Sequence, residues 1–191
     1  MRSLRVKLAL AVVVAGVLGV GAVAVAGGGG GRIDDSLSSF EEVPSLSTPG
    51  VGTFDARIRG QEIHYRLRFD DLESIILQSH IHFEQATQNG DIVVFLCSNL
   101  GNGPAGTQRC PENARSGTVT GVIRPADVLG NASARGLGAG EFDELVRAIR
   151  AGATYVNVHS MTRPGGEIRG QLEDDPHEGD HDRGHGHGRD D

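Results

Sequence analysis

The sequence predicts an all-β fold, an antiparallel immunoglobulin-like β-sandwich with one inserted short helix. Seven short segments have the strand pattern, in which apolar residues alternate with polar ones or form a brief continuous run. Turn signals rich in glycine, asparagine and proline separate them, and only one segment has apolar residues at helical spacing. Short strands at this spacing are typical of a sandwich or barrel.

The strand pattern is clearest in "EIHYRLRF", where four apolar residues alternate with four polar ones. "DIVVFLC" is a continuous apolar run that indicates a central strand, and Asn89-Gly90 before it predicts a turn. The predicted strands are 51–58, 62–69, 74–84, 91–97, 116–123, 153–160 and 166–173.

The exception is residues 140–152, where Phe142, Leu145, Val146 and Ile149 recur at helical spacing. Gly152 ends this predicted helix as a C-cap. A single helical turn is also expected at 125–130, where a proline starts it.

The amino-terminal end has the features of a targeting segment. A basic start is followed by an apolar run that closes with the small residues "AVA", which predicts a signal peptide over residues 1–26. The alternative is an uncleaved membrane anchor, because the run is just long enough to span a bilayer. Either interpretation places the remaining chain outside the cytoplasm, secreted or in the cell envelope.

Composition divides the rest of the chain into three parts. Residues 27–44 begin with five glycines and are expected to form a flexible linker, and residues 45–173 form the folded domain. Residues 174–191 contain no aliphatic or aromatic side chain and are expected to be a disordered tail. The domain is mildly acidic and shows no basic patch, which excludes nucleic acid as a partner.

The chain has two cysteines, Cys97 and Cys110. In an oxidising compartment an even pair predicts a disulfide, which would fasten the loop between them. A catalytic thiol is the alternative, and it would need a nearby histidine that the local sequence does not supply.

The segments "SHIHF", "NGDIVVFLC", "SGTVTGVI", "LVRAIRAGATYVNVHS" and "PGGEIRGQL" resemble the CHRD (chordin) domain in order and spacing, over roughly residues 50–173. Bacterial secreted members similarly carry cysteines that match Cys97 and Cys110. The resemblance implies an extracellular β-sandwich with no established reaction. The family has a suggested similarity to copper/zinc superoxide dismutase, and "HIHFE" looks like that enzyme's "HVHEF" metal strand. The enzyme's long metal-binding loop has no counterpart here, which argues against dismutase activity.

Three histidines are the candidate metal ligands. His80 and His82 leave the same face of a strand, and the valines of "YVNVHS" turn His159 away from the core. We expect His159 to lie beside His80 and His82 on the outer face, with Ile81 and Phe83 in the core. Three imidazoles suit copper or zinc; the alternative is that they pack and hydrogen-bond across the sheet.

The tail carries four further histidines among carboxylates and is a weak metal-binding candidate: His177, His181, His185 and His187. No catalytic residue is identified, and Glu167 is expected to pair with Arg169 across strands.

Three functions follow from these features. The first is a non-enzymatic extracytoplasmic module of CHRD type that binds a protein or surface ligand or has a structural role. The second is a copper- or zinc-binding protein for storage, buffering or delivery. The third is a superoxide-dismutase-like metalloenzyme. A membrane is a partner only if the amino-terminal segment stays uncleaved.

Overall fold

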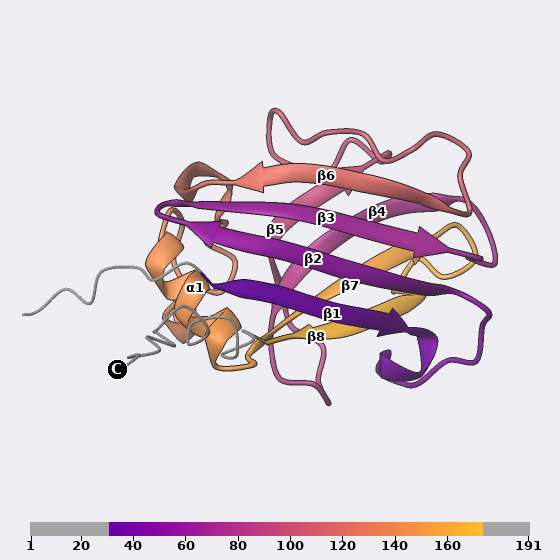
Figure 1. Cartoon of the computed structure of the whole chain (residues 1–191), viewed down its shortest axis with the longest axis horizontal. Coiled ribbons are helices and arrows are strands. Elements are labelled where there is room, and N and C mark those ends of the chain that lie inside the picture. Colours follow the sequence, from indigo (N-terminus) through magenta and orange to yellow (C-terminus); the bar gives the residue numbers. More distant parts are fainter. Residues whose placement is uncertain (1–30, 174–191) are drawn as a thin grey trace, which may run out of the picture.

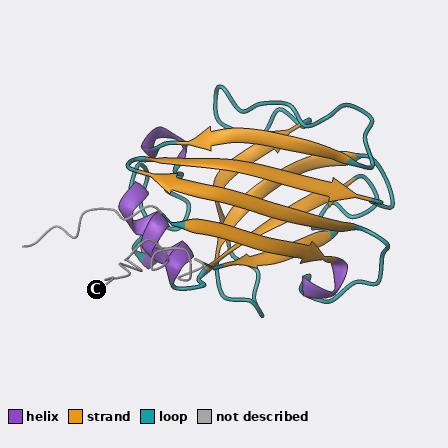
Figure 2. Ribbon diagram, viewed as in Figure 1, coloured by secondary structure: helices purple, strands orange, loops and turns teal. Residues whose placement is uncertain are grey.

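The computed structural model describes residues 31–173, and within them eight strands form one antiparallel sheet that folds into two layers (Figures 1 and 2). The all-β prediction is confirmed. The strands are β1 (Arg32–Ser38), β2 (Val51–Arg59), β3 (Glu62–Asp70), β4 (Ile76–Phe83), β5 (Asp91–Ser98), β6 (Gly117–Ile123), β7 (Thr154–Ser160) and β8 (Ile168–Leu172).

The order of strands across the sheet is β5-β4-β7-β8-β1-β2-β3-β6. In Figure 1, β1, β2, β3 and β6 form the nearer layer, and β4, β5, β7 and β8 lie behind it. The layers are joined where β1 meets β8, through the pair Ser38 and Arg169. The two outermost strands, β5 and β6, also approach each other, so the sandwich is nearly closed.

The core lies between the layers, because the alternating apolar residues of each strand point inward. β3 follows the predicted alternation throughout: its four apolar residues are at most 7% exposed, and its intervening side chains face out. Val156 and Val158 supply the core from β7, as expected.

One helix, α1 (Phe142–Arg150), lies inside the predicted range and covers one end of the sandwich (Figure 2). Its four apolar side chains are all buried against the core. Three short 3-10 turns complete the elements: η1 (Ser39–Glu41), η2 (Pro125–Asp127) and η3 (Ser133–Arg135). Within residues 31–173, no helix is long and apolar enough to cross a membrane.

The expected linker over 27–44 is wrong for most of its length, because residues 32–38 form β1 and residues 39–41 form η1. β1 pairs with β2 along all seven of its residues, and Ile33 and Leu37 are buried in the core. The sequence did not reveal this strand for two reasons: five consecutive glycines precede it, and only two of its residues are apolar. The folded unit therefore begins near Arg32. The predicted signal peptide, residues 27–30 and the tail lie outside the described residues.

Cys97 and Cys110 form a disulfide with an S–S distance of 2.06 Å. Cys97 is on β5, and Cys110 lies in the long loop between β5 and β6. The bond holds to the sheet a loop that is rich in glycine, asparagine and proline, and both sulfurs are buried.

Candidate metal centre

The structure brings three histidines together on the outer side of the rear layer. His80 and His82 come from β4, and His159 comes from the neighbouring strand β7. One potential ligand atom from each imidazole lies within 4.8 Å of the other two. The clustering that strand alternation predicted is therefore present.

Strand pairing sets this arrangement. In the β4–β7 register, His80 lies opposite Asn157, His82 opposite Tyr155, and His159 opposite Gln78. β4 also has register shifts against β5 on either side of His80 and Ile81. Such irregularities turn side chains away from strict alternation, and they recur beside functional sites.

All three histidines are buried, although they lie on the outer side of the sheet as expected. His80, His82 and His159 are 0%, 7% and 5% exposed. Ile81 is in the core as expected, whereas Phe83 is only partly buried.

A cover of polar residues explains the burial. The Arg169 guanidinium on β8 lies 3.4 Å from the centre of the Tyr155 ring, and it donates a 2.9 Å hydrogen bond to the Gln85 carbonyl. Asn89 in the same β4–β5 turn donates to the Val43 carbonyl at 2.8 Å. The turn and the segment after η1 thus close over the outer face.

Two of the imidazoles are oriented by backbone carbonyls. His82 Nδ1 lies 2.9 Å from the Gly90 carbonyl oxygen, and His159 Nδ1 lies 2.9 Å from that of Pro164. A carbonyl only accepts, so Nδ1 carries the hydrogen in both residues and Nε2 presents a lone pair. This second hydrogen bond is the one that metal-binding histidines usually make.

Gly90 has a specific part in this orientation. A Cβ at this position would lie 2.3 Å from the Phe83 carbonyl oxygen, so a side chain there would clash with the backbone. The turn can bring its carbonyl to His82 only because residue 90 is glycine. The Asn89-Gly90 pair therefore shapes the site as well as the turn.

The other ring nitrogens differ in whether they have a hydrogen-bond partner. His80 Nδ1 lies 3.1 Å from His159 Nε2, which also lies 3.0 Å from the Asn157 side-chain oxygen. Nε2 of His80 and Nε2 of His82 are buried without a hydrogen-bond partner among the described residues. Buried polar atoms are rarely left in this way, because each costs about 1–3 kcal/mol. A metal ion would satisfy such lone pairs.

The imidazoles are neutral near pH 7. Burial, reinforced by the neighbouring histidines, lowers the pKa of His80 to about 2. Burial lowers the pKa of His159 to about 4, although its bond to Pro164 opposes the shift. Burial also lowers the pKa of His82. Neutral imidazole is the form that binds copper and zinc.

A model of the CHRD domain family matches residues 34–172, which is most of the chain. The chain belongs to the CHRD domain family. No curated protein and no solved structure matches it. The match begins within β1, so the CHRD domain includes the strand that was expected to be a linker.

Glu42 and Arg169 were not placed beside the histidine cluster from the sequence of this CHRD domain. Glu42 is 5% exposed, its Oε1 has no partner among the described residues, and burial raises its pKa to about 7. Arg169 was expected to pair with Glu167 but contacts Tyr155 instead. No sequence pattern indicated that Glu42 is buried, because it follows β1 and η1, which were expected to be part of a linker.

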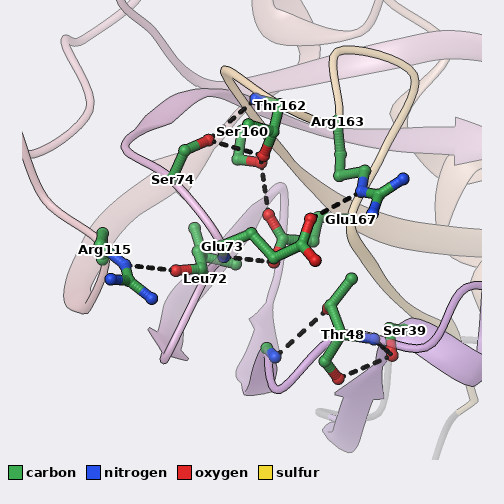
Figure 3. Close-up of polar contacts among 11 residues, drawn as sticks. Ser39, Thr48, Leu72, Glu73, Ser74, Arg115, Ser160, Thr162, Arg163 and Glu167 are labelled. Atoms are coloured by element: carbon green, nitrogen blue, oxygen red, sulfur yellow. Dashed lines mark hydrogen bonds and ion pairs between the residues drawn. The ribbon is translucent and has the colours of Figure 1, made fainter.

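Glu167 belongs to a different polar network, shown in Figure 3. Its carboxylate accepts a 2.6 Å hydrogen bond from the Glu73 amide and another from the Ser160 hydroxyl. The Glu73 side chain in turn accepts from Arg163 at 2.8 Å. The network joins the β3–β4 loop to the β7–β8 turn. Each carboxylate oxygen of Glu167 accepts a hydrogen bond within it.

The four tail histidines lie outside the described residues, so their weak metal binding stays a prediction.

Proposed function

We propose that this protein is an exported, non-enzymatic CHRD module that binds one copper or zinc ion through His80, His82 and His159. The observation that carries the proposal is the convergence of three imidazoles within 4.8 Å. This proposal combines the first two functions considered in the sequence analysis: the protein is a binding module of CHRD type, and the ligand that it binds is a metal ion.

The donor set supports copper or zinc. Neutral imidazole nitrogen suits both ions, whereas calcium and magnesium prefer oxygen. The hydrogen bonds of His82 and His159 to backbone carbonyls direct Nε2 of each toward the cluster; Nε2 of His82 has no partner among the described residues, whereas Nε2 of His159 would exchange its contact with His80 for the ion. Little reorganisation of the His82 side chain is then needed when the ion arrives.

Burial favours holding the ion over chemistry on a substrate. Catalytic metal sites keep a position open to water or substrate, whereas these three histidines are at most 7% exposed. The Arg169 contact with Gln85 lies across the same face. Storage, buffering or delivery fits such a covered site better than turnover.

Export is supported by the predicted signal peptide and by the Cys97–Cys110 disulfide. Disulfides persist mainly in oxidising compartments.

Elemental analysis of protein purified without an affinity tag tests the proposal. The natural chain should carry copper or zinc at close to one ion per molecule, and His159→Gln should carry less than about a tenth of that. His64→Gln is the matched control, because His64 is exposed on the opposite layer, and it should keep its metal. Equal content in the two variants would reject the site.

A superoxide dismutation assay on the metal-loaded protein separates binding from catalysis. Activity no higher than that of the same ion free in buffer is expected. Turnover that is lost in His159→Gln would show a metalloenzyme instead.

A further inference from the structure

The nearer layer carries a concentration of arginines on its outer face. β2 and β3 pair so that Arg57 lies opposite His64, Asp55 opposite Arg66, and Thr53 opposite Arg68. Strand alternation points these side chains outward, away from the core. The outer face of this layer is turned toward the viewer in Figure 1.

These arginines line a shallow open depression of about 820 Å³. Asp55 is the one carboxylate in its lining. Its charged lining residues are Arg32, Asp55, Arg57, Arg66 and Arg68. Arg32 pairs with Asp34 at 3.0 Å, and the other three guanidinium groups against the one carboxylate of Asp55 give this face positive charge, although the whole chain has a net charge of −7.

Arg57, Arg66 and Arg68 are exposed, and they make no hydrogen bond or ion pair with any described residue. Arg147 and Arg163, elsewhere on the surface, both pair with a glutamate. Three arginines held on a rigid sheet without partners are available to a ligand.

The expectation of no basic patch was therefore wrong. Arg66 and Arg68 are two residues apart on β3, whereas Arg57 lies on β2, and Glu62 stands between them along the sequence. The register between β2 and β3 brings them together, and a single sequence does not reveal that register.

We propose that this arginine face, Arg57, Arg66 and Arg68, binds a linear anionic polysaccharide. A guanidinium group binds carboxylate or sulfate with two parallel hydrogen bonds. β2 and β3 are nine residues each, so the face is about 30 Å long and suits an extended polymer. Thr53, Thr118 and Thr120 add exposed hydroxyl groups that can bond to sugar hydroxyls.

Nucleic acid fits this face less well. Proteins that hold single strands stack bases on exposed aromatic rings. The aromatic residues of β2 and β3, Phe54, Tyr65 and Phe69, are all buried in the core. The face therefore offers charge and hydroxyl groups without a stacking surface.

Binding of the full-length protein to immobilised dextran sulfate tests the proposal, with uncharged dextran as the ligand control. Arg66→Gln/Arg68→Gln should weaken binding at least tenfold at about 50 mM salt. Arg147→Gln/Arg150→Gln removes the same charge from α1 and should change binding less than twofold. Raising the salt to about 200 mM should weaken natural-chain binding about tenfold. Binding releases counterions from the polyanion, and this release favours binding less at higher salt.

Each alternative result overturns a stated part of the proposal. Equal losses in the two double variants would show general electrostatic attraction, and no loss in either would place the binding elsewhere. Binding to uncharged dextran would remove the role of charge. Single-stranded DNA that binds more tightly than dextran sulfate through the same arginines would make nucleic acid the ligand. Melting temperatures within about 2 °C of the natural chain establish that both variants are folded.

Discussion

Two clusters of buried polar residues, both anchored on β7, differ in how their hydrogen bonds are arranged. At the end of β7, both carboxylate oxygens of Glu167 accept hydrogen bonds from the Glu73 amide and the Ser160 hydroxyl. On its outer face, His159 meets His80 and His82, and two buried Nε2 atoms have no partner among the described residues.

The difference separates a structural role from a binding role. A satisfied buried network stabilises the fold, and removing one member leaves the others without partners. A buried cluster with spare lone pairs lowers stability unless a ligand completes it. In this molecule, stability should depend on the Glu167 network and metal binding on the histidines.

The largest expected effect is on the Glu167 network. Glu167→Ala should lower the free energy of unfolding by about 3–5 kcal/mol, because the Glu73 amide and the Ser160 hydroxyl lose their buried acceptor. Urea unfolding followed by circular dichroism measures this. Glu144→Ala on the exposed side of α1 is the control and should cost less than about 1 kcal/mol. A loss below 1 kcal/mol for Glu167→Ala would remove the distinction between the clusters.

The second effect is a pH dependence of the metal-free histidine cluster. The pKa of His80 is lowered to about 2, so below pH 6.5 the unfolded chain takes up a proton there while the folded chain does not. Stability present above pH 6.5 is therefore lost as the pH falls, by about 1.4 kcal/mol per pH unit.

His80→Gln isolates this contribution from that of Glu42. Because the pKa of Glu42 is raised to about 7, its own effect has the opposite sign, with stability gained as the pH falls from 7 toward 4.5. The advantage of the natural chain over His80→Gln should shrink by about 2 kcal/mol between pH 6.5 and 4.5. A difference that does not change with pH would mean that His80 titrates normally.

The third expected effect is a small change in the free energy of unfolding. His82→Leu should change the stability of the metal-free protein by less than about 1.5 kcal/mol, because it removes an unpartnered buried nitrogen along with the bond to Gly90. Urea unfolding in the presence of a chelator measures this. A loss of 3 kcal/mol or more would place His82 with the structural network instead.

The sequence predicted seven of the eight strands, the helix and the meeting of the three histidines, because each depends on a periodic pattern within one segment. β1 was missed, since Ile33 and Leu37 are its only apolar residues and glycines precede it. The burial of the histidines was also missed, because it depends on Arg169 and Asn89 closing over the sheet.

The arginine face shows the same limit. Its charges lie on different strands, and only the β2–β3 register brings Arg57 near Arg66. Sequence patterns within one strand predict which side chains share a face, whereas side chains on neighbouring strands meet according to the register, which a single sequence does not contain.

Calorimetric titration of metal-free full-length protein with zinc tests the central claim most directly. The four tail histidines are replaced by alanine, so that only the core cluster and exposed His64 remain. The account predicts one zinc ion per chain, loss of binding in His82→Leu, and unchanged binding in His64→Leu. Absence of zinc binding in the parent, with copper giving the same result, would contradict it and leave the three histidines as packing residues.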